Sequence, residues 1–312
     1  MKRLIVFVIL AALLLTGCSG TAPITQQTYA MDTLMTFTVW SKDGYYITEA
    51  LSSLMDQLES EWSATDNKSI ISKLNRGETV ELDDEQKAFL EQVEALSVRT
   101  RGAFDPKLYS VSEAWGFFGG DTKVPSAEML ETALKDEKWD LGAAVKGYAG
   151  QQAVALLEEL GVERALLNLG GNVQTFGQKK DGSPWQIGIE DPDGSQVNLG
   201  VLSVEGTASI VTSGDYERYI ELDGKRYHHI MDPETGCPAE SGLRSVTVIS
   251  RDGLTADALS TALFVMGLEE GAEFWRESDD FEAVFVLTTG EIYATEGANL
   301  SGCEFEVISR EK

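Results

Sequence analysis

Two oxygen-bearing side chains, Asp257 and Thr261, stand four residues apart in a stretch whose apolar residues recur at helical spacing. That separation places both on one face of a helix. A carboxylate and a hydroxyl on one face suit a hard cation such as Mg²⁺. The same pattern fits a carboxylate that only stabilises the start of the helix and a threonine that packs. The spacing alone leaves both interpretations open.

The two histidines of the chain, His228 and His229, precede a turn-forming segment, Asp232-Pro233-Glu234-Thr235-Gly236. An imidazole beside an acidic turn is a candidate general acid or base. A structural histidine is an equally good interpretation of the pair. We therefore treat this segment as a candidate site that needs support from elsewhere in the chain.

Two glycine-bearing segments could approach a ligand closely. Residues 140–148 (DLGAAVKGY) lead into a predicted helix, where free N–H groups can bind phosphate and Lys146 can add charge. Gly170-Gly171-Asn172 follows a predicted strand and forms either a ligand contact or a simple turn. Neither segment is a Walker or G-x-G-x-x-G motif. Together with Asp257 and Thr261, they suggest a site for a phosphorylated ligand and a divalent metal.

The charge of the chain limits its partners. With 25 Lys and Arg against 51 Asp and Glu, the net charge is −26, and no basic stripe is visible. Nucleic-acid binding depends on clustered cations, so that class is excluded. An anionic ligand needs a metal ion or backbone N–H groups to offset the field of the protein itself.

The first residues resemble an export signal. Lys2 and Arg3 precede an apolar run of about 12 residues, and Leu15-Thr16-Gly17-Cys18 resembles a bacterial lipobox. We expect a signal peptide over 1–17, lipidation of Cys18, a polar tether over 18–29 and a functional domain over 30–312. The protein would then be anchored on the outer side of the cytoplasmic membrane or on the periplasmic side of an envelope membrane. Cys237 and Cys303 are interpreted as small, partly buried residues, although a disulfide between them is possible.

Periodicity predicts one mixed α+β domain, rich in antiparallel strands with packed helices. Expected helices cover 46–60, 84–99, a segment ending near Leu160, and 254–267 with Thr255 as its N-cap. Residues around 115–118 are expected to be a surface excursion, and Asp223-Gly224 predicts a hairpin. The expected strands are 31–40, 164–169, 185–190, 197–204, 209–211, 216–222, 225–230, 245–250, 283–288, 291–294 and 304–308.

Eight motifs, in order, resemble those of the bacterial flavin transferase lipoprotein family (ApbE-type FAD:protein FMN transferases). They are Met31-Asp32-Thr33, residues 63–75, Gly102-Ala103-Phe104-Asp105-Pro106, residues 140–148, Leu169-Gly170-Gly171-Asn172, residues 212–216, residues 229–236 and residues 256–262. The resemblance spans most of the chain after the signal segment. Val145, Met231 and Ser260 depart from the family's commoner residues without removing a required functional group.

This resemblance implies a fold related to the T-fold, binding of FAD and Mg²⁺, and transfer of FMN to a Thr or Ser hydroxyl of an acceptor protein with release of AMP. By residue-by-residue similarity, Ala143 (through its carbonyl), Asp257 and Thr261 match metal ligands. Met31, Ala103, Phe104, Asp105, Asp140, Lys146 and Met231 match flavin-nucleotide contacts. His229 and Asp257 match catalytic positions, whereas His228 falls outside the chemistry.

Two other functions remain possible from the sequence. The same metal site would serve an FAD pyrophosphatase, in which water replaces the acceptor hydroxyl and free FMN and AMP result. A non-catalytic flavin-binding lipoprotein belongs to a different class. A solute-binding lipoprotein is disfavoured because the second half of the chain is β-rich rather than built from alternating βα units.

Overall fold

The computed structural model describes residues 22–119, 123–194 and 198–311. Cys18 and the rest of the predicted signal segment lie outside these residues. Within the described part of the chain, no helix is long and apolar enough to cross a membrane. The helices are α1 (Gly44–Trp62), α2 (Ile70–Asn75), α3 (Asp84–Arg99), α4 (Tyr109–Trp115), α5 (Ala127–Leu134), α6 (Val145–Glu159) and α7 (Gly253–Arg276).

A nine-stranded sheet forms the centre of the fold, in the order β1-β2-β3-β4-β7-β10-β11-β12-β14. Its neighbours are antiparallel except for the parallel pair β12–β14. Its strands are β1 (Ile24–Ala30), β2 (Thr33–Val39), β3 (Ala165–Leu169), β4 (Asn172–Phe176), β7 (Ala208–Gly214), β10 (Leu243–Ser250), β11 (Phe281–Leu287), β12 (Ile292–Thr295) and β14 (Glu306–Ile308). Two smaller sheets contain β5 (Trp185–Ile189), β6 (Gly200–Val204) and β13 (Leu300–Ser301), and β8 (Tyr219–Leu222) with β9 (Lys225–His228).

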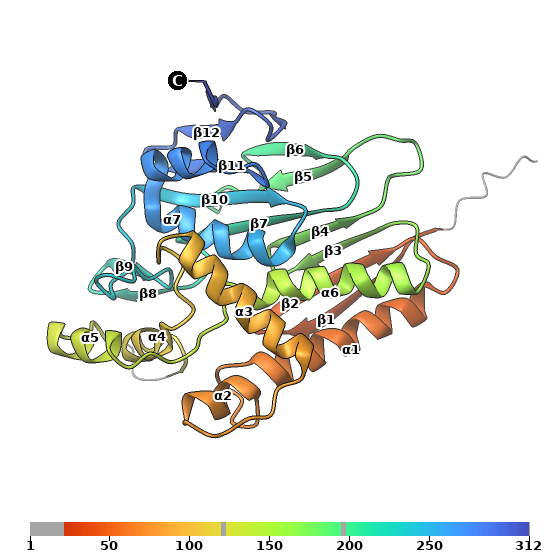
Figure 1. Ribbon diagram of the computed structural model, residues 1–312. Helices are drawn as coiled ribbons and strands as arrows, with labels where there is room; N and C mark the ends of the chain where they lie inside the picture. The colour runs from red at the N-terminus through yellow and green to blue at the C-terminus, as the bar shows by residue number, and fades with distance from the viewer. Residues whose placement is uncertain (1–21, 120–122, 195–197, 312) are drawn as a thin grey trace, which may run out of the picture.

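Side-chain alternation along the strands divides the core between the two faces of the large sheet. On β7, Val211 packs with α7, while its neighbour Ile210 packs with the three-stranded sheet on the opposite face. Helices α1, α6 and α7 cover the first face (Figure 1). Because both faces are covered, the central strands are buried on both sides. The first four residues of β7, 208–211, are all buried.

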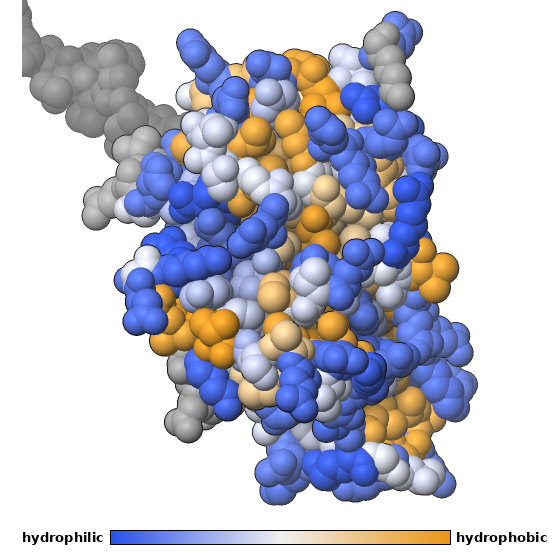
Figure 2. Space-filling view, turned by 90° about the vertical axis from the view of Figure 1, so that its left-hand side faces the viewer, coloured by the Kyte–Doolittle hydropathy of each residue, from blue (hydrophilic) through white to orange (hydrophobic). Residues whose placement is uncertain are grey.

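A smaller core lies where α4 and α5 meet the segment after β9. Val111, Trp115, Leu130 and Met231 form it, and the Trp115 indole N–H donates to the Gly236 carbonyl at 2.8 Å. The expectation of a surface excursion at 115–118 is therefore wrong for Trp115, which is only 2% exposed. Figure 2 views the side of the molecule with α4, α5 and the β8–β9 hairpin, where hydrophobic areas are small and separated by hydrophilic ones.

The fold class is confirmed, and α3 and the β8–β9 hairpin agree closely with prediction. Asp223 and Gly224 have φ of 51° and 76°, as a two-residue turn between twisted strands requires. Residues 24–29 of the predicted tether, however, belong to β1, which pairs with β2 along its whole length. Backbone pairing can recruit a polar strand that has little apolar signal of its own.

Helix α7 differs from prediction at both ends. Its N-cap is Asp252 rather than Thr255: the Thr255 N–H donates to Asp252 Oδ1 at 2.7 Å. The helix continues past the predicted end to Arg276, with an interruption at Gly267 (φ 77°, ψ −176°). Apolar residues at helical spacing resume after this glycine with Leu268, Ala272 and Trp275, so the sequence carried a signal for the second half that the prediction did not use.

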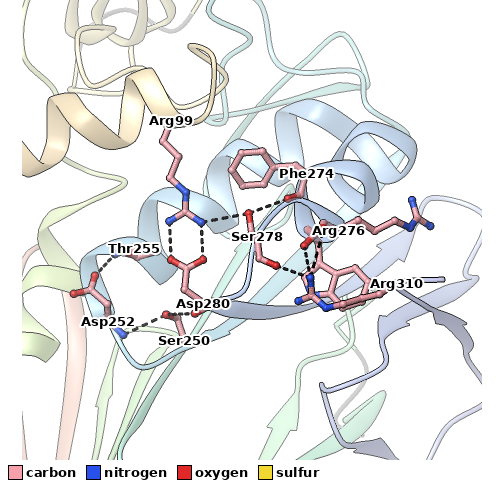
Figure 3. Close-up of polar contacts among 10 residues, drawn as sticks. Arg99, Ser250, Asp252, Thr255, Phe274, Arg276, Ser278, Asp280 and Arg310 are labelled. Atoms are coloured by element: carbon pink, nitrogen blue, oxygen red, sulfur yellow. Dashed lines mark hydrogen bonds and ion pairs between the residues drawn. The ribbon is translucent and has the colours of Figure 1, made fainter. Parts of the chain in front are cut away.

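Hydrogen bonds tie the start of α7 to the end of α3 (Figure 3). Arg99 forms a two-pronged ion pair with Asp280 at 2.7 and 2.6 Å. The Asp280 carbonyl accepts from Ser250 Oγ at 2.9 Å, and Ser250 Oγ accepts from the Asp252 N–H at 3.2 Å. The residue that caps α7 is therefore held by contacts reaching back to another helix.

Replacing Asp252 by Ala should lower the free energy of unfolding by about 1 kcal/mol, because the first turn of α7 loses its side-chain acceptor. Asp252→Asn keeps an acceptor and serves as the matched control. Denaturant unfolding monitored by circular dichroism measures both variants. Equal stability of the Ala variant and the wild type would contradict the capping role.

Candidate active site

A cleft of about 590 Å³ opens between the helical layer, the β1–β2 turn and the segment around His229. Segments far apart in the sequence line it, including the 103–105 turn, the 140–146 loop, the 170–172 turn and the start of α7. All eleven residues predicted for the site border this cleft: Met31, Ala103, Phe104, Asp105, Asp140, Ala143, Lys146, His229, Met231, Asp257 and Thr261. Their positions thus converge, while their individual roles stay predictions.

The N-terminal turns of α6 and α7 cross in backbone contact. A Cβ atom on Gly147 would lie 2.1 Å from the Gly253 carbonyl oxygen, and a Cβ on Gly253 would lie 2.3 Å from the Gly147 carbonyl oxygen. No side chain fits at either position without moving the backbone. This contact brings the first turns of the two helices to one end of the cleft.

Asp257 lies at this crossing and is 4% exposed. Its Oδ2 accepts the Gly147 N–H at 2.7 Å, so the α6 backbone holds the carboxylate of α7. Burial raises the pKa of Asp257, while Lys146 and the Gly147 N–H lower it. Desolvation is the largest of these effects, so the negative charge of the carboxylate is not fully compensated and a further positive partner would stabilise it.

The other candidate metal ligands supply neutral oxygens. The Thr261 hydroxyl lies 3.2 Å from Ser213 Oγ, which lies 2.7 Å from Ser260 Oγ. Ala143 lies just before α6 and borders the same cleft. Across the described ranges, no group of three or more His, Cys, Asp or Glu side chains is placed to hold a metal ion. One carboxylate, one hydroxyl and one carbonyl form a different, all-oxygen donor set that suits a hard cation.

His229 is held from one side by a single carbonyl. Its backbone N–H and its ring Nδ1 both lie 3.0 Å from the Arg218 carbonyl oxygen. A carbonyl can only accept, so Nδ1 carries the proton and Nε2 is the free ring acceptor. Desolvation by the surrounding protein, assisted by the charge of Arg218, lowers the pKa of His229 to about 3, and the side chain stays partly exposed to the cleft. The ring is therefore neutral at physiological pH.

His228 points away from this chemistry. Its Nε2 lies 3.1 Å from the Ala239 carbonyl oxygen, and its ring contacts Phe264 edge-on. Cys237 and Cys303 are both free thiols, so the disulfide considered from the sequence is absent.

Two predicted nucleotide contacts are carboxylates fixed by local turns. Asp105 accepts the Lys107 N–H at 2.8 Å, and Asp140 accepts the Gly142 N–H at 3.0 Å. Burial raises the pKa of both carboxyl groups despite these bonds. The ring of Phe104, which directly precedes Asp105, belongs to the main core, and the residue is 1% exposed.

Five charged residues of the cleft were not among the predicted site residues: Asp32, Glu59, Glu190, Glu217 and Arg218. Glu217 and Arg218 directly follow the 212–216 motif, and that adjacency was the available signal. Burial raises the pKa of Glu217 to about 7, with Lys146 acting in the opposite direction. Glu217 is nevertheless exposed to solvent in the cleft, and solvent favours its charged form.

A model of the ApbE family matches residues 31–285. The chain belongs to the ApbE family. It is 30% identical to the FAD:protein FMN transferase of Treponema pallidum, over 90% of both proteins. A protein of the same name from Klebsiella pneumoniae is 46% identical, but that match spans 49% of this chain and only 46% of the relative.

Solved structures of the ApbE family share the fold. The ApbE protein of Thermotoga maritima has a TM-score of 0.81 and 34% identity, over 88% of this chain and 97% of that one. The apo flavinyl transferase ApbE of Pseudomonas stutzeri has a TM-score of 0.75 and 30% identity, over 86% and 92%. The predicted relation to the T-fold stays a prediction.

Gly147→Ala should cost about 1–3 kcal/mol or more of stability, because the new methyl group overlaps the Gly253 carbonyl. Gly150→Ala, one turn later in α6, is the control: its Cβ would lie 3.3 Å from Gln174 Oε1 and 3.7 Å from Leu169 Cδ1, which are side-chain rather than backbone atoms. Denaturant unfolding compares the two. A Gly147→Ala protein as stable as Gly150→Ala would refute the tight crossing.

Stability should depend on the protonation of His229. Between pH 6.5 and about 3, an unfolded chain binds a proton at this residue and the folded chain does not. The contribution of His229 to the free energy of unfolding therefore decreases as pH falls through this window. His229→Gln should show a shallower loss of stability between pH 6.5 and 4. Identical slopes for the two proteins would contradict a desolvated, neutral ring.

Proposed function

We propose that this protein transfers FMN from FAD to a Thr or Ser hydroxyl of an acceptor protein, forming a phosphoester bond and releasing AMP. The observation that carries the proposal is the buried Asp257 carboxylate, held by the start of α6 and facing a cleft with Lys146. The names of the full-length relatives support the same activity.

Mg²⁺ fits the oxygen donors of Asp257, Thr261 and the Ala143 carbonyl. The raised pKa of Asp257 supports this assignment, since a buried carboxylate short of compensation favours a cation. When bound, the ion would offset the negative charge of the pyrophosphate and of the AMP leaving group.

The chain's own residues bind and orient the substrate. Asp105 and Asp140 sit on rigid turns and present oxygen atoms to polar groups of the nucleotide. Met31, Ala103 and Met231 supply apolar surface for the flavin nucleotide, and Phe104 supports that wall from the core. Lys146 supplies positive charge beside Asp257 for the phosphates. Fixed groups of this kind lower the barrier by positioning.

Phosphoryl transfer needs a proton acceptor. The acceptor hydroxyl oxygen forms a bond to the FMN phosphorus while the bridging P–O bond breaks and AMP leaves. The hydroxyl proton goes to His229 Nε2, the ring nitrogen that the Arg218 carbonyl leaves free. Anionic substrate in the cleft raises the pKa of the ring from its low value in the free protein, which makes Nε2 a better base.

Cleavage of FAD by water is the alternative within the same site, because water would reach the phosphorus along the same path as the acceptor hydroxyl. A flavin-binding protein without catalysis is the alternative of another class.

We further propose that Cys18 carries a lipid that anchors the protein outside the cytoplasmic membrane, or on the periplasmic side of an envelope membrane.

Asp257→Asn should reduce transfer by about 10²–10³-fold, the range that removal of one electrostatic stabiliser produces. The assay incubates the protein with FAD, Mg²⁺ and a candidate acceptor, and measures the fluorescent flavin band on the acceptor together with AMP. Asp279→Asn, at an exposed acid beyond α7, is the control.

Each product pattern separates the functions. Labelled acceptor with AMP supports transfer, whereas free FMN with AMP and no label supports hydrolysis. FAD that survives unchanged with both wild type and Asp257→Asn would support a passive flavin binder.

A further inference from the structure

The cleft is strongly acidic, although its proposed ligand is an anionic dinucleotide. Among the described residues that line it, seven are carboxylates: Asp32, Glu59, Asp105, Asp140, Glu190, Glu217 and Asp257. Only Lys146 and Arg218 are cations there, since His229 is neutral. Lys146 lies beside Asp257 and is partly offset by it. Arg218 is therefore the second source of positive charge for a phosphate.

Arg218 combines a fixed backbone with a free side chain. Its carbonyl accepts both the backbone N–H and the ring Nδ1–H of His229, which pins the residue at the wall of the cleft. Its guanidinium is 49% exposed and makes one ion pair, 4.0 Å from Asp32 Oδ2. A pair this long, with Asp32 75% exposed, is weak and easily exchanged.

The charge of Arg218 already reaches several groups of the site. It lowers the pKa of Asp140 and of Glu217, and it helps to lower the pKa of His229. Arg218 itself lines the cleft together with these three residues, so its charge acts on the site directly.

Asp32, the partner of Arg218, belongs to the turn between β1 and β2. Met31 and Asp32 both adopt left-handed backbone conformations, with φ of 50° and 58°. Asp and Asn tolerate this region better than most residues. The turn therefore presents a carboxylate to Arg218, and Asn can replace it without added strain.

We propose that Arg218 binds a phosphate group of the substrate and exchanges its ion pair with Asp32 for that contact when the substrate enters. This assignment rests on the proposed function, because it takes a flavin nucleotide as the ligand. A guanidinium offers two parallel N–H donors to phosphate oxygens, which makes it suited to this contact. Asp32 acts as a competing anion that holds the side chain in position before binding.

Equilibrium binding tests the phosphate contact. Riboflavin, FMN and AMP are titrated in Mg²⁺, where none can react, and FAD is titrated with a chelator present. Arg218→Ala should weaken the binding affinity for FAD by about 10–100-fold, as expected for a lost charged hydrogen bond. The affinity for FMN or for AMP, whichever carries the phosphate that Arg218 contacts, should fall by a similar factor. Riboflavin, which has no phosphate, should bind as it does to the wild type.

Two further variants guard against trivial effects. Arg226→Ala removes an equal charge from the nearby β9, where the guanidinium stacks on the Tyr219 ring outside the cleft, and should leave affinity unchanged. Arg218→Lys keeps the charge and should recover part of the lost affinity. Unchanged FAD affinity in Arg218→Ala, or an equal loss for riboflavin, would overturn the proposal.

The exchange with Asp32 has its own signature. Asp32→Asn should tighten FAD binding by a few-fold, opposite in sign to Arg218→Ala. In the Arg218→Ala background, that gain should largely disappear, since no ion pair remains to be exchanged. A gain of equal size in both backgrounds would mean that Asp32 acts only by general repulsion, and the exchange would be refuted.

These binding tests do not depend on turnover. If Arg218→Ala loses affinity for phosphate-bearing ligands while the wild type labels no acceptor, the Arg218 contact stands and the transfer function fails. If acceptor labelling proceeds and FAD affinity is indifferent to Arg218, the transfer function stands and the contact fails.

Discussion

The candidate site depends on one steric constraint, the backbone contact between Gly147 and Gly253. Two helices can approach this closely only when neither carries a side chain at the crossing. The approach lets a Gly147 N–H reach the Asp257 carboxylate, and it turns two helix N-termini toward the same space. Both termini carry partial positive charge, which favours anions at that spot. The position of the acidic residue, its hydrogen bond and its electrostatic surroundings thus follow from the absence of two methyl groups.

Charge is the second organising feature, because the charged groups that line the cleft are mainly carboxylates while the proposed ligand is an anionic nucleotide. Burial raises the pKa of Asp105, Asp140 and Asp257, so the charges of these cleft carboxylates are only partly compensated by the protein. Folding this arrangement costs free energy that a more neutral lining would not. A cation relieves that cost when it binds, and each such group therefore favours cation binding over an empty site.

Much of the site could be predicted because it depends on local signals. The glycine-bearing turns and the helical spacing of Asp257 and Thr261 are visible in a few consecutive residues, whereas the nucleotide contacts, such as Met31 and Asp105, were predicted only from the resemblance to the family. The strand β1 was missed because pairing with β2, rather than its own composition, makes it a strand. Trp115 was misplaced because its partner, the Gly236 carbonyl, is distant in sequence. Arg218 offered only its position directly after the 212–216 motif as a signal, because its contacts with His229 and Asp32 form only in the folded chain.

The edge strand β1 connects the start of the described chain directly to the cleft. It runs from Ile24 to Ala30, and the next residues form the turn that carries Asp32. Seven residues of strand span about 23 Å, and the six residue steps from Cys18 to Ile24 span at most about 21 Å. With a lipid on Cys18, the turn at the cleft would lie no more than roughly 45 Å from the membrane surface. Under the proposed function, the acceptor hydroxyl would then have to be presented close to the bilayer, which would restrict the protein to membrane-proximal substrates regardless of their affinity for the site.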